Sequence, residues 1–358
     1  MLKKLEILNY KNIESAVLEF SPNVNCFIGC NGEGKTNLLD AIYFLSFTKS
    51  ATNHIDSMNI RHGEDMMMLK GEYDDDNQVV CGLKRGQSKQ IRYNQKLYKR
   101  ISDHIGLLPL ILISPNDQQL ILGNSEERRR FMDQVIAQYD RSYLHSLTRC
   151  NQALAQRNKL LKLENTSDDL LIIYEEIMAE EGERIYAARR KFINDTTPLF
   201  QKYYNLISEN REKITLDYIS QCVRGPLLQT IQVGRDKDKI MGYSLHGVHK
   251  DDIEMTLGGY PIKKEGSQGQ NKTYLVSLKL AQFNFLHSVT GCTPILLLDD
   301  IFDKLDAERM TQIIKLVSGK QFGQIFITDT NRENIDRILE NTGKDYLLYK
   351  VKGGKVFI

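Results

Sequence analysis

The sequence predicts a split α/β domain interrupted by a helical insertion, and three observations support this fold class. Two continuous apolar runs, Ile295 to Leu298 and Ile325 to Ile327, are typical of parallel strands buried on both faces. Short alternating runs before residue 114 favour antiparallel hairpins. Between these parts, Leu147, Leu154 and Leu161 recur every seven residues and indicate a helix.

These patterns divide the chain into three parts. Residues 1–114 carry the first strands and the hairpins, with turn signals at Asp74 to Asn77 and at Arg85 to Gln87. Residues 115–244 form a mostly helical arm, and residues 245–358 return to alternating strands and helices. We expect 1–114 and 245–358 to build one domain, into which the arm is inserted.

The arm is predicted to be an antiparallel helical hairpin. Asn165 to Ser167 interrupt the helical period, and Ser167 is a candidate cap of a second helix. On this helix we expect Leu170, Ile173 and Ile177 to share the apolar face. At 1.5 Å per residue each helix would reach on the order of 30 Å. An ordinary helical subdomain and a true two-stranded coil both fit this pattern.

The composition describes a globular chain without an obvious polyanionic partner. Its 48 basic and 46 acidic residues give a net charge of +2, so nucleic-acid binding would require a local basic face. The N-terminus lacks the apolar run of a signal peptide, and no stretch approaches the roughly 20 apolar residues that span a bilayer. Six cysteines without CxxC pairs fit reduced thiols. We therefore expect a soluble, cytoplasmic protein.

A phosphate-binding loop follows the first predicted buried strand. Residues 29–36 satisfy G-x-x-x-x-G-K-[ST] in the strand, loop and helix setting that this motif requires. Its glycines allow backbone N–H groups to turn towards a polyphosphate, Lys35 would reach the β- and γ-phosphates, and the Thr36 hydroxyl would bind Mg²⁺. The residues assigned to nucleotide binding here are Gly29, Cys30, Asn31, Gly32, Glu33, Gly34, Lys35, Thr36 and Asn37. ATP and Mg²⁺ are the expected cofactors.

Two adjacent carboxylates end a predicted buried strand far downstream. Ile295 to Leu298 lead directly into Asp299 and Asp300. We assign Asp299 to the magnesium ion held by Thr36, and Asp300 to the attacking water as a base or orienting group. With Lys35, these two aspartates are the predicted catalytic residues. The alternative is a pair of solvated acids at a strand end.

A Ser-x-Gly-Gln turn lies between these two motifs. Ser267, Gly269 and Gln270 open a predicted helix, whose N-terminal dipole would make a second anion site. Taken alone, such a pattern of residues is more often a simple N-cap. Their position between the phosphate loop and the aspartates favours a functional interpretation.

In this order the motifs resemble those of ABC-type ATPase heads, and within that group those of the RecF family. The resemblance covers essentially the whole chain and extends to Leu8 to Asn12, Glu126 to Asp133 and Gly247 to Lys250. It implies a P-loop, SMC-like head with antiparallel β hairpins and an inserted helical arm. It also implies that Lys11 and Asn12 approach the nucleotide phosphates.

Further roles follow from the same resemblance. Two copies would dimerise around ATP, with Ser267 of one meeting the γ-phosphate bound by Lys35 of the other. Asp306 would lie in the D-loop, and residues 116–119 would occupy the Q-loop region. The resemblance also implies weak ATPase activity coupled to DNA binding, at gaps and at junctions of single and double strands. The implied partners in loading recombinase are RecR and RecO.

The chain departs from the family pattern at two places. Transporter-type heads carry a switch histidine after the last strand, where this chain has Thr328 to Thr330. In the Gly-x-His-Arg stretch, RecF-like chains usually carry proline and often arginine at the positions of Val248 and Lys250. Lysine keeps the charge but loses bidentate phosphate contact.

Two basic clusters are candidates for contact with DNA phosphates or with the partner subunit. Arg128 to Arg130 form one, and Arg184, Arg189, Arg190 and Lys191 form the other. The alternative for both is a solvated helix face whose charges pair with neighbouring acids. A cytoplasmic ATPase subunit of a transporter and an SMC-like head with a nuclease module remain the alternative functions. The long helical insertion and the missing histidine speak against the first, and the lack of further clustered metal-binding acids speaks against the second.

Overall fold

The computed structural model describes residues 1–53, 55–163, 167–302, 305–319, 321–333, 335–336, 340 and 345–357. The chain forms two compact units. The first comprises Met1–Asp117 and Gln282–Ile358, and the second comprises Gln118–Ala281. The second boundary differs from the one we predict at residue 244. A strand after residue 250 pairs with a strand before residue 220, and this pairing keeps the intervening chain in the second unit.

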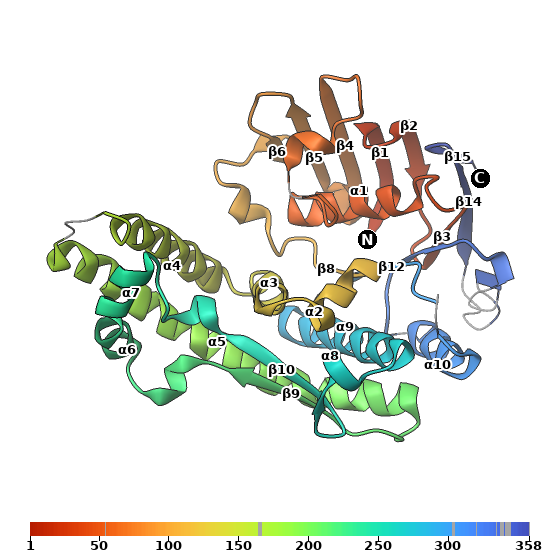
Figure 1. Cartoon of the computed structure of the whole chain (residues 1–358). Coiled ribbons are helices and arrows are strands. Elements are labelled where there is room, and N and C mark those ends of the chain that lie inside the picture. The colour runs from red at the N-terminus through yellow and green to blue at the C-terminus, as the bar shows by residue number, and fades with distance from the viewer. Residues whose placement is uncertain are drawn as a thin grey trace. The chain divides into compact units, whose positions relative to one another are not determined.

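An antiparallel sheet forms one part of the first unit. Its strand order is β2-β1-β4-β5-β6-β7, as Figure 1 shows for the labelled strands. The strands are β1 (Leu2–Tyr10), β2 (Ile13–Glu19), β4 (Met66–Tyr73), β5 (Gln78–Lys84), β6 (Gln90–Tyr93) and β7 (Lys96–Leu97). Burial alternates along β4 and β5, so one face packs on the core and the other faces solvent. The predicted hairpins are confirmed.

A second, mostly parallel sheet completes this unit. Its order is β15-β14-β3-β13-β12-β8, and only β15 runs antiparallel to its neighbour. The strands are β3 (Val24–Ile28), β8 (Leu110–Ile113), β12 (Ile295–Asp299), β13 (Ile325–Asp329), β14 (Tyr346–Lys352) and β15 (Lys355–Phe357). Every residue of β12 and β13 is buried, which confirms the interpretation of their apolar runs.

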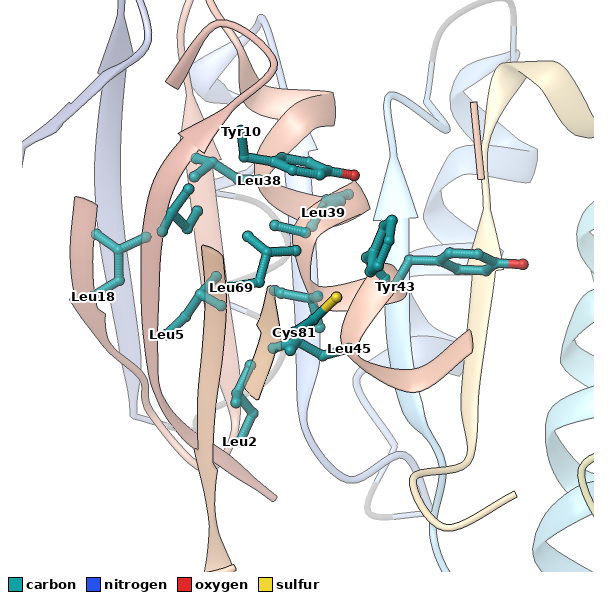
Figure 2. Close-up of a cluster of buried hydrophobic side chains, with 14 of the residues drawn as sticks. Leu2, Leu5, Tyr10, Leu18, Leu38, Leu39, Tyr43, Leu45, Leu69 and Cys81 are labelled. Carbon is teal, nitrogen blue, oxygen red and sulfur yellow. The ribbon is translucent and has the colours of Figure 1, made fainter. Parts of the chain in front are cut away.

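Helix α1 (Lys35–Phe47) packs against strands of both sheets, and eleven of its thirteen residues are buried. Figure 2 shows its Leu38, Leu39 and Leu45 among side chains from the antiparallel sheet, such as Leu5 and Leu69. Truncating such a buried leucine to alanine costs about 2–5 kcal/mol. Because α1 cannot shift without breaking this core, the loop at its N-terminus is fixed. Helix α10 (Ala307–Val317) also belongs to this unit.

The second unit is built on two long helices that lie side by side in Figure 1, α4 (Arg141–Leu160) and α5 (Asp168–Ser208). Ser167 caps α5 by accepting a hydrogen bond from the Asp169 backbone N–H, as predicted. The 41 residues of α5 reach about 60 Å, twice the predicted length. Asn165 and Thr166, which we expect to interrupt the helices, lie outside the described residues.

The apolar face predicted for α5 is wrong. Leu170 and Ile173 are about half exposed, whereas the buried stripe contains Leu171, Glu175 and Met178. A charged side chain belongs to this stripe because Arg157 of α4 pairs with Glu175, and both are fully buried. The sequence pattern misses the stripe because it counts only apolar residues.

Shorter elements complete the second unit. A three-stranded antiparallel sheet has the order β11-β10-β9. Its strands are β9 (Ile214–Ile219), β10 (Asp252–Leu257) and β11 (Tyr260–Pro261). The other helices are α2 (Gln119–Leu122), α3 (Ser125–Ile136), α6 (Leu227–Val233), α7 (Arg235–Met241), α8 (Ile262–Glu265) and α9 (Gln268–Thr290), which contains the unit boundary. Among the helices of the described ranges, none is long and apolar enough to cross a membrane.

Candidate phosphate-binding site

The predicted site residues of the first unit gather at one edge of the parallel sheet. In the strand registers Ile28 lies beside Asp329, Thr328 beside Asp299, and Leu298 beside Ile113. The carboxyl ends of β3, β13, β12 and β8 therefore meet at this edge, where ligands bind in open α/β sheets. The phosphate loop follows β3 and the paired aspartates end β12, so the fold brings together motifs some 260 residues apart.

In the loop between β3 and α1, backbone angles favour glycine at two positions, and close contacts favour it at two. Gly32 (φ 81°) and Gly34 (φ 111°) adopt left-handed backbone angles. A Cβ on Gly34 would also lie 2.8 Å from the Asn12 amide, and one on Gly29 would lie 2.3 Å from the Val351 carbonyl oxygen. Gly32 borders open space. The loop therefore keeps its shape only with these glycines, and its open side leaves room for a ligand.

Lys35 is held inside the loop that precedes it. Its side chain is buried, and its Nζ donates to the carbonyl oxygens of Gly29 at 2.8 Å and Cys30 at 2.9 Å. No side chain caps α1, whose N-cap is Gly34. The loop thus presents backbone N–H groups, a helix N-terminus and an ammonium group together, a combination that binds phosphate.

Thr36 and Asp299 meet directly. The Thr36 hydroxyl lies 3.0 Å from each carboxylate oxygen of Asp299. Burial raises the pKa of Asp299, and hydrogen bonds from Thr328 and Thr36 oppose this rise. One hydroxyl and one carboxylate are hard oxygen donors of the kind that Mg²⁺ prefers when it also binds phosphate oxygens. These two residues therefore fit a magnesium ion.

Thr328 lies in the segment where transporter-type heads carry a switch histidine, and the sequence pattern predicts no role for it. Its hydroxyl donates to Asp299 Oδ1 at 2.6 Å and accepts from the Asp300 backbone N–H at 3.1 Å. Asp300 has a left-handed backbone (φ 49°). Thr328 therefore links both aspartates to β13. The parallel register between β12 and β13 places Thr328 beside Asp299, and the sequence pattern does not predict that register.

Two turns brace the outside of the loop. The Asn12 amide donates to the Glu33 carbonyl oxygen at 3.3 Å and accepts from Asn37 Nδ2 at 2.8 Å. In the β14–β15 turn, the backbone N–H of Gly354 donates to the Glu33 carbonyl oxygen at 2.9 Å. Lys11, predicted to approach the phosphates, pairs with the buried Asp40 of α1.

The residues predicted to form the D-loop and the signature lie at the starts of helices. Asp306 caps α10 by accepting from the Arg309 backbone N–H at 2.8 Å. In the second unit, Ser267 and Gln270 bond reciprocally: the Ser267 N–H donates to Gln270 Oε1 at 2.8 Å, and the Gln270 N–H donates to Ser267 Oγ at 3.2 Å. The other end of the Gln270 amide donates to Glu212 at 2.7 Å. Gln270 therefore shapes the turn, while Ser267 is exposed and Gly269 half-buried.

The segment predicted to form the Q-loop follows β8. Residues 115–118 form a single 3-10 turn, and Ser114 donates through its backbone N–H to Asp117 at 2.7 Å. The boundary between the compact units falls inside this segment, between Asp117 and Gln118. The segment predicted as the Q-loop thus begins at the carboxyl edge of the parallel sheet.

Both predicted basic clusters are largely paired with acids. Arg128 forms a bidentate pair with Asp252, and Arg130 pairs with Glu126 and Glu127. Arg189 is buried against Asp133 and Asp251. Arg184 pairs with Glu180 and Glu181, and Lys191 pairs with Asp195. These contacts favour the structural alternative for most of the two clusters.

Comparison with known proteins places this geometry among ATPase heads. Residues 1–346 match the model of the RecF/RecN/SMC N-terminal domain. The DNA replication and repair protein RecF of Phocaeicola vulgatus is 57% identical over 362 residues, covering 99% of this chain and 98% of that protein. RecF of Porphyromonas gingivalis is 49% identical and is covered, like this chain, to 100%.

Solved structures agree with these relatives. The recombination mediator protein RecF-ATP of the RecFOR pathway aligns with a TM-score of 0.88 at 29% identity, covering 99% of this chain and 96% of that one. The Smc head domain of Pyrococcus furiosus aligns with a TM-score of 0.59 at 18% identity, covering 99% of this chain and 95% of that one. The second likeness concerns the fold alone. Together they confirm the predicted fold class, an α/β head with an inserted helical arm.

Proposed function

Since the chain belongs to the RecF family of SMC-type head ATPases, we propose that it is an ATP-dependent DNA-binding protein of replication and recombinational repair. In this proposal ATP closes a homodimer, slow hydrolysis reopens it, and the closed dimer resides on gapped DNA. The observation that carries the proposal is the contact between Thr36 and Asp299 at the mouth of the phosphate loop. This contact brings together the phosphate loop and the paired aspartates, which are far apart in the sequence.

The site residues divide the chemistry among them. Lys35 and the N–H groups of the loop bind the β- and γ-phosphates and neutralise charge that develops on the γ-phosphoryl oxygens. Thr36 and Asp299 would hold Mg²⁺, which supplies charge compensation when bound. Asp300 orients a water molecule, whose oxygen bonds to the γ-phosphorus as the bond from that phosphorus to ADP breaks. The water proton passes to the Asp300 carboxylate or to the released phosphate. The products are ADP and inorganic phosphate.

Dimerisation would add Ser267 from a second copy to the γ-phosphate. Support comes from the exposure of this serine at the start of α9 and from the Gln270 and Glu212 contacts that hold its turn. An exposed hydroxyl at a helix N-terminus is suited to an anion presented by another molecule. Gly269 and Asp306 would border the same interface. RecR and RecO are the proposed partners, by family likeness, in loading recombinase.

The test compares two substitutions. Lys35→Ala should abolish ATP binding in a fluorescent-nucleotide titration, because it removes the buried ammonium group of the loop. Asp300→Asn should keep ATP binding, lose hydrolysis by at least about 100-fold, and accumulate as a dimer with ATP in sizing chromatography. A monomeric Asp300→Asn protein under saturating ATP would contradict the dimer mechanism. Wild-type nucleotide affinity in Lys35→Ala would contradict the site itself.

A transporter's ATPase subunit, the alternative function considered from the sequence, shares the phosphate loop and the signature but not the family membership. The threonine-based link at Thr328 and the long helices α4 and α5 speak for the first proposal. A gel mobility assay with gapped DNA, with and without ATP and RecR, separates them. A transporter subunit would leave the DNA unshifted, and a nuclease would degrade it.

A further inference from the structure

One stretch of the first unit concentrates positive charge more strongly than either predicted cluster. Residues 84–102 contain no Asp or Glu and seven basic residues: Lys84, Arg85, Lys89, Arg92, Lys96, Lys99 and Arg100. The whole chain carries a net charge of +2, so the rest of the chain is left with −5. The stretch is therefore strongly basic while the rest of the chain is acidic. The small net charge of the whole chain does not reveal this difference.

Two of these seven side chains are used inside the fold. Arg85 donates to the carbonyl oxygen of Glu64 at 2.8 Å, and Lys89 donates to that of Thr48 at 2.7 Å and pairs with Asp56. The other five are exposed, and we call them the basic edge: Lys84, Arg92, Lys96, Lys99 and Arg100. Among the residues that the structure describes, no acid lies within ion-pairing distance of any of the five.

The basic edge lies where the antiparallel sheet ends. Strands β6 and β7 are the last in the strand order, and Figure 1 shows β6 on the opposite side of the sheet from β2. Arg92 lies opposite Val80 on one side and Leu97 on the other, and Lys96 lies opposite Tyr93. Successive side chains of a strand point to opposite faces, so Arg92 and Lys96 place charge on both sides of the hairpin. Nearer the middle of the same sheet, the Lys70 side chain of β4 is paired with Glu6 and Glu72.

The chemistry of the edge suits phosphate groups better than a protein surface. Exposed Gln87, Ser88, Gln90 and Gln95 interleave with the cations and supply neutral hydrogen-bond donors. Between residues 84 and 102, Leu97 is the one exposed large hydrophobic side chain. Protein interfaces usually bury an aromatic or apolar centre, which the edge lacks. Cations and polar donors without such a centre are typical of sequence-independent backbone contact with nucleic acid.

We propose that the basic edge binds the phosphate backbone of DNA. This inference rests on the proposed DNA-binding function and deepens it, because it assigns the contact to β5–β7 and the chain just after them. Neither of the two clusters predicted from sequence carries comparable unpaired charge. Arg128 is paired with Asp252, and Arg189 is paired with Asp133 and Asp251.

The test removes charge from the edge without disturbing the core. The triple variant Arg92→Gln, Lys96→Gln, Lys99→Gln changes only exposed side chains. Binding to gapped duplex DNA in the presence of saturating ATP is measured by fluorescence anisotropy from about 50 to 200 mM salt. Three lost phosphate contacts should lower the slope of log affinity against log salt by about 2–3. Affinity at the lowest salt should fall at least about tenfold.

The matched control neutralises three exposed cations of the second unit, Arg184→Gln, Arg190→Gln and Lys191→Gln, and should keep the wild-type slope. Fluorescent-ATP titration should give wild-type affinity for both triple variants. An edge variant with the wild-type slope and affinity would overturn the inference and leave the proposed function standing. Wild-type protein that binds no DNA would instead refute the proposed function. An edge variant that keeps DNA binding but loses poly-glutamate binding would reassign the edge to an acidic protein, which also overturns the proposal.

Discussion

Single residues support the predicted nucleotide-binding motifs through hydrogen bonds that link distant parts of the chain. Thr328 holds Asp299 and Asp300, Asn12 holds the loop at Glu33, and Glu212 holds Gln270. None of these three partners belongs to the core of a nucleotide motif. Each keeps a motif residue in one orientation, which is how supporting side chains make a site precise.

Thr328→Val tests this support at the aspartate pair. Valine keeps the shape but removes the 2.6 Å hydrogen bond to Asp299. Because that bond lowers the pKa of Asp299 while burial raises it, the pKa should rise further in the variant. Magnesium-dependent ATP binding requires the carboxylate and should therefore shift to higher pH, as followed by nucleotide titration from pH 5 to 9. Thr311→Val, on the exposed face of α10, is the control and should leave the profile in place. Identical profiles for all three proteins would contradict this role of Thr328.

At the scale of elements, the helical hairpin is organised by buried charge as well as by apolar packing. Arg157 of α4 is fully buried and donates to Glu175 of α5 at 2.8 Å and to Asp238 of α7 at 2.7 Å. Ser244 Oγ accepts a further hydrogen bond at 2.7 Å. One guanidinium therefore joins α4, α5 and α7. Burying charges is costly unless each is paired, so the three helices can assemble in this way only with all partners present.

Arg157→Met should destabilise the protein by about 3–5 kcal/mol, because it strands the buried carboxylate of Asp238 and weakens the pairing of Glu175. Lys191→Met removes an ion pair between two exposed side chains, Lys191 and Asp195, and should cost at most about 1 kcal/mol. Urea unfolding followed by circular dichroism measures both. Equal, small effects would mean that the buried network does not stabilise the arm.

At the scale of the whole molecule, the net charge does not reveal how the stability of the protein responds to acid. His249 lies in the second unit, where its Nε2 is 3.1 Å from the Ser244 carbonyl oxygen. Burial lowers the pKa of His249 from its ordinary value to about 4. The folded state therefore binds this proton less readily than the unfolded state. Its contribution to stability is complete above about pH 6.5 and is lost as the pH falls towards 4.

His249→Gln retains a hydrogen-bond donor and cannot titrate. The free energy of unfolding of the wild type should fall by about 3 kcal/mol more than that of the variant between pH 7 and pH 4. The burial of Asp251 raises its pKa and opposes acid unfolding in both proteins alike. His62→Gln, at an exposed position, should follow the wild type. Parallel curves for wild type and His249→Gln would contradict the assignment.

The sequence by itself determined the phosphate loop, the paired aspartates, the buried parallel strands and the family, because these depend on local pattern and fixed spacing. Only the tertiary structure decided which residues surround them. Thr328 reaches Asp299 through strand register, Glu175 is buried because Arg157 meets it, and the basic edge stays unpaired because its sheet ends there. The spacing of apolar residues predicts strands and helices, but it does not indicate which charged side chains will pair in the folded protein.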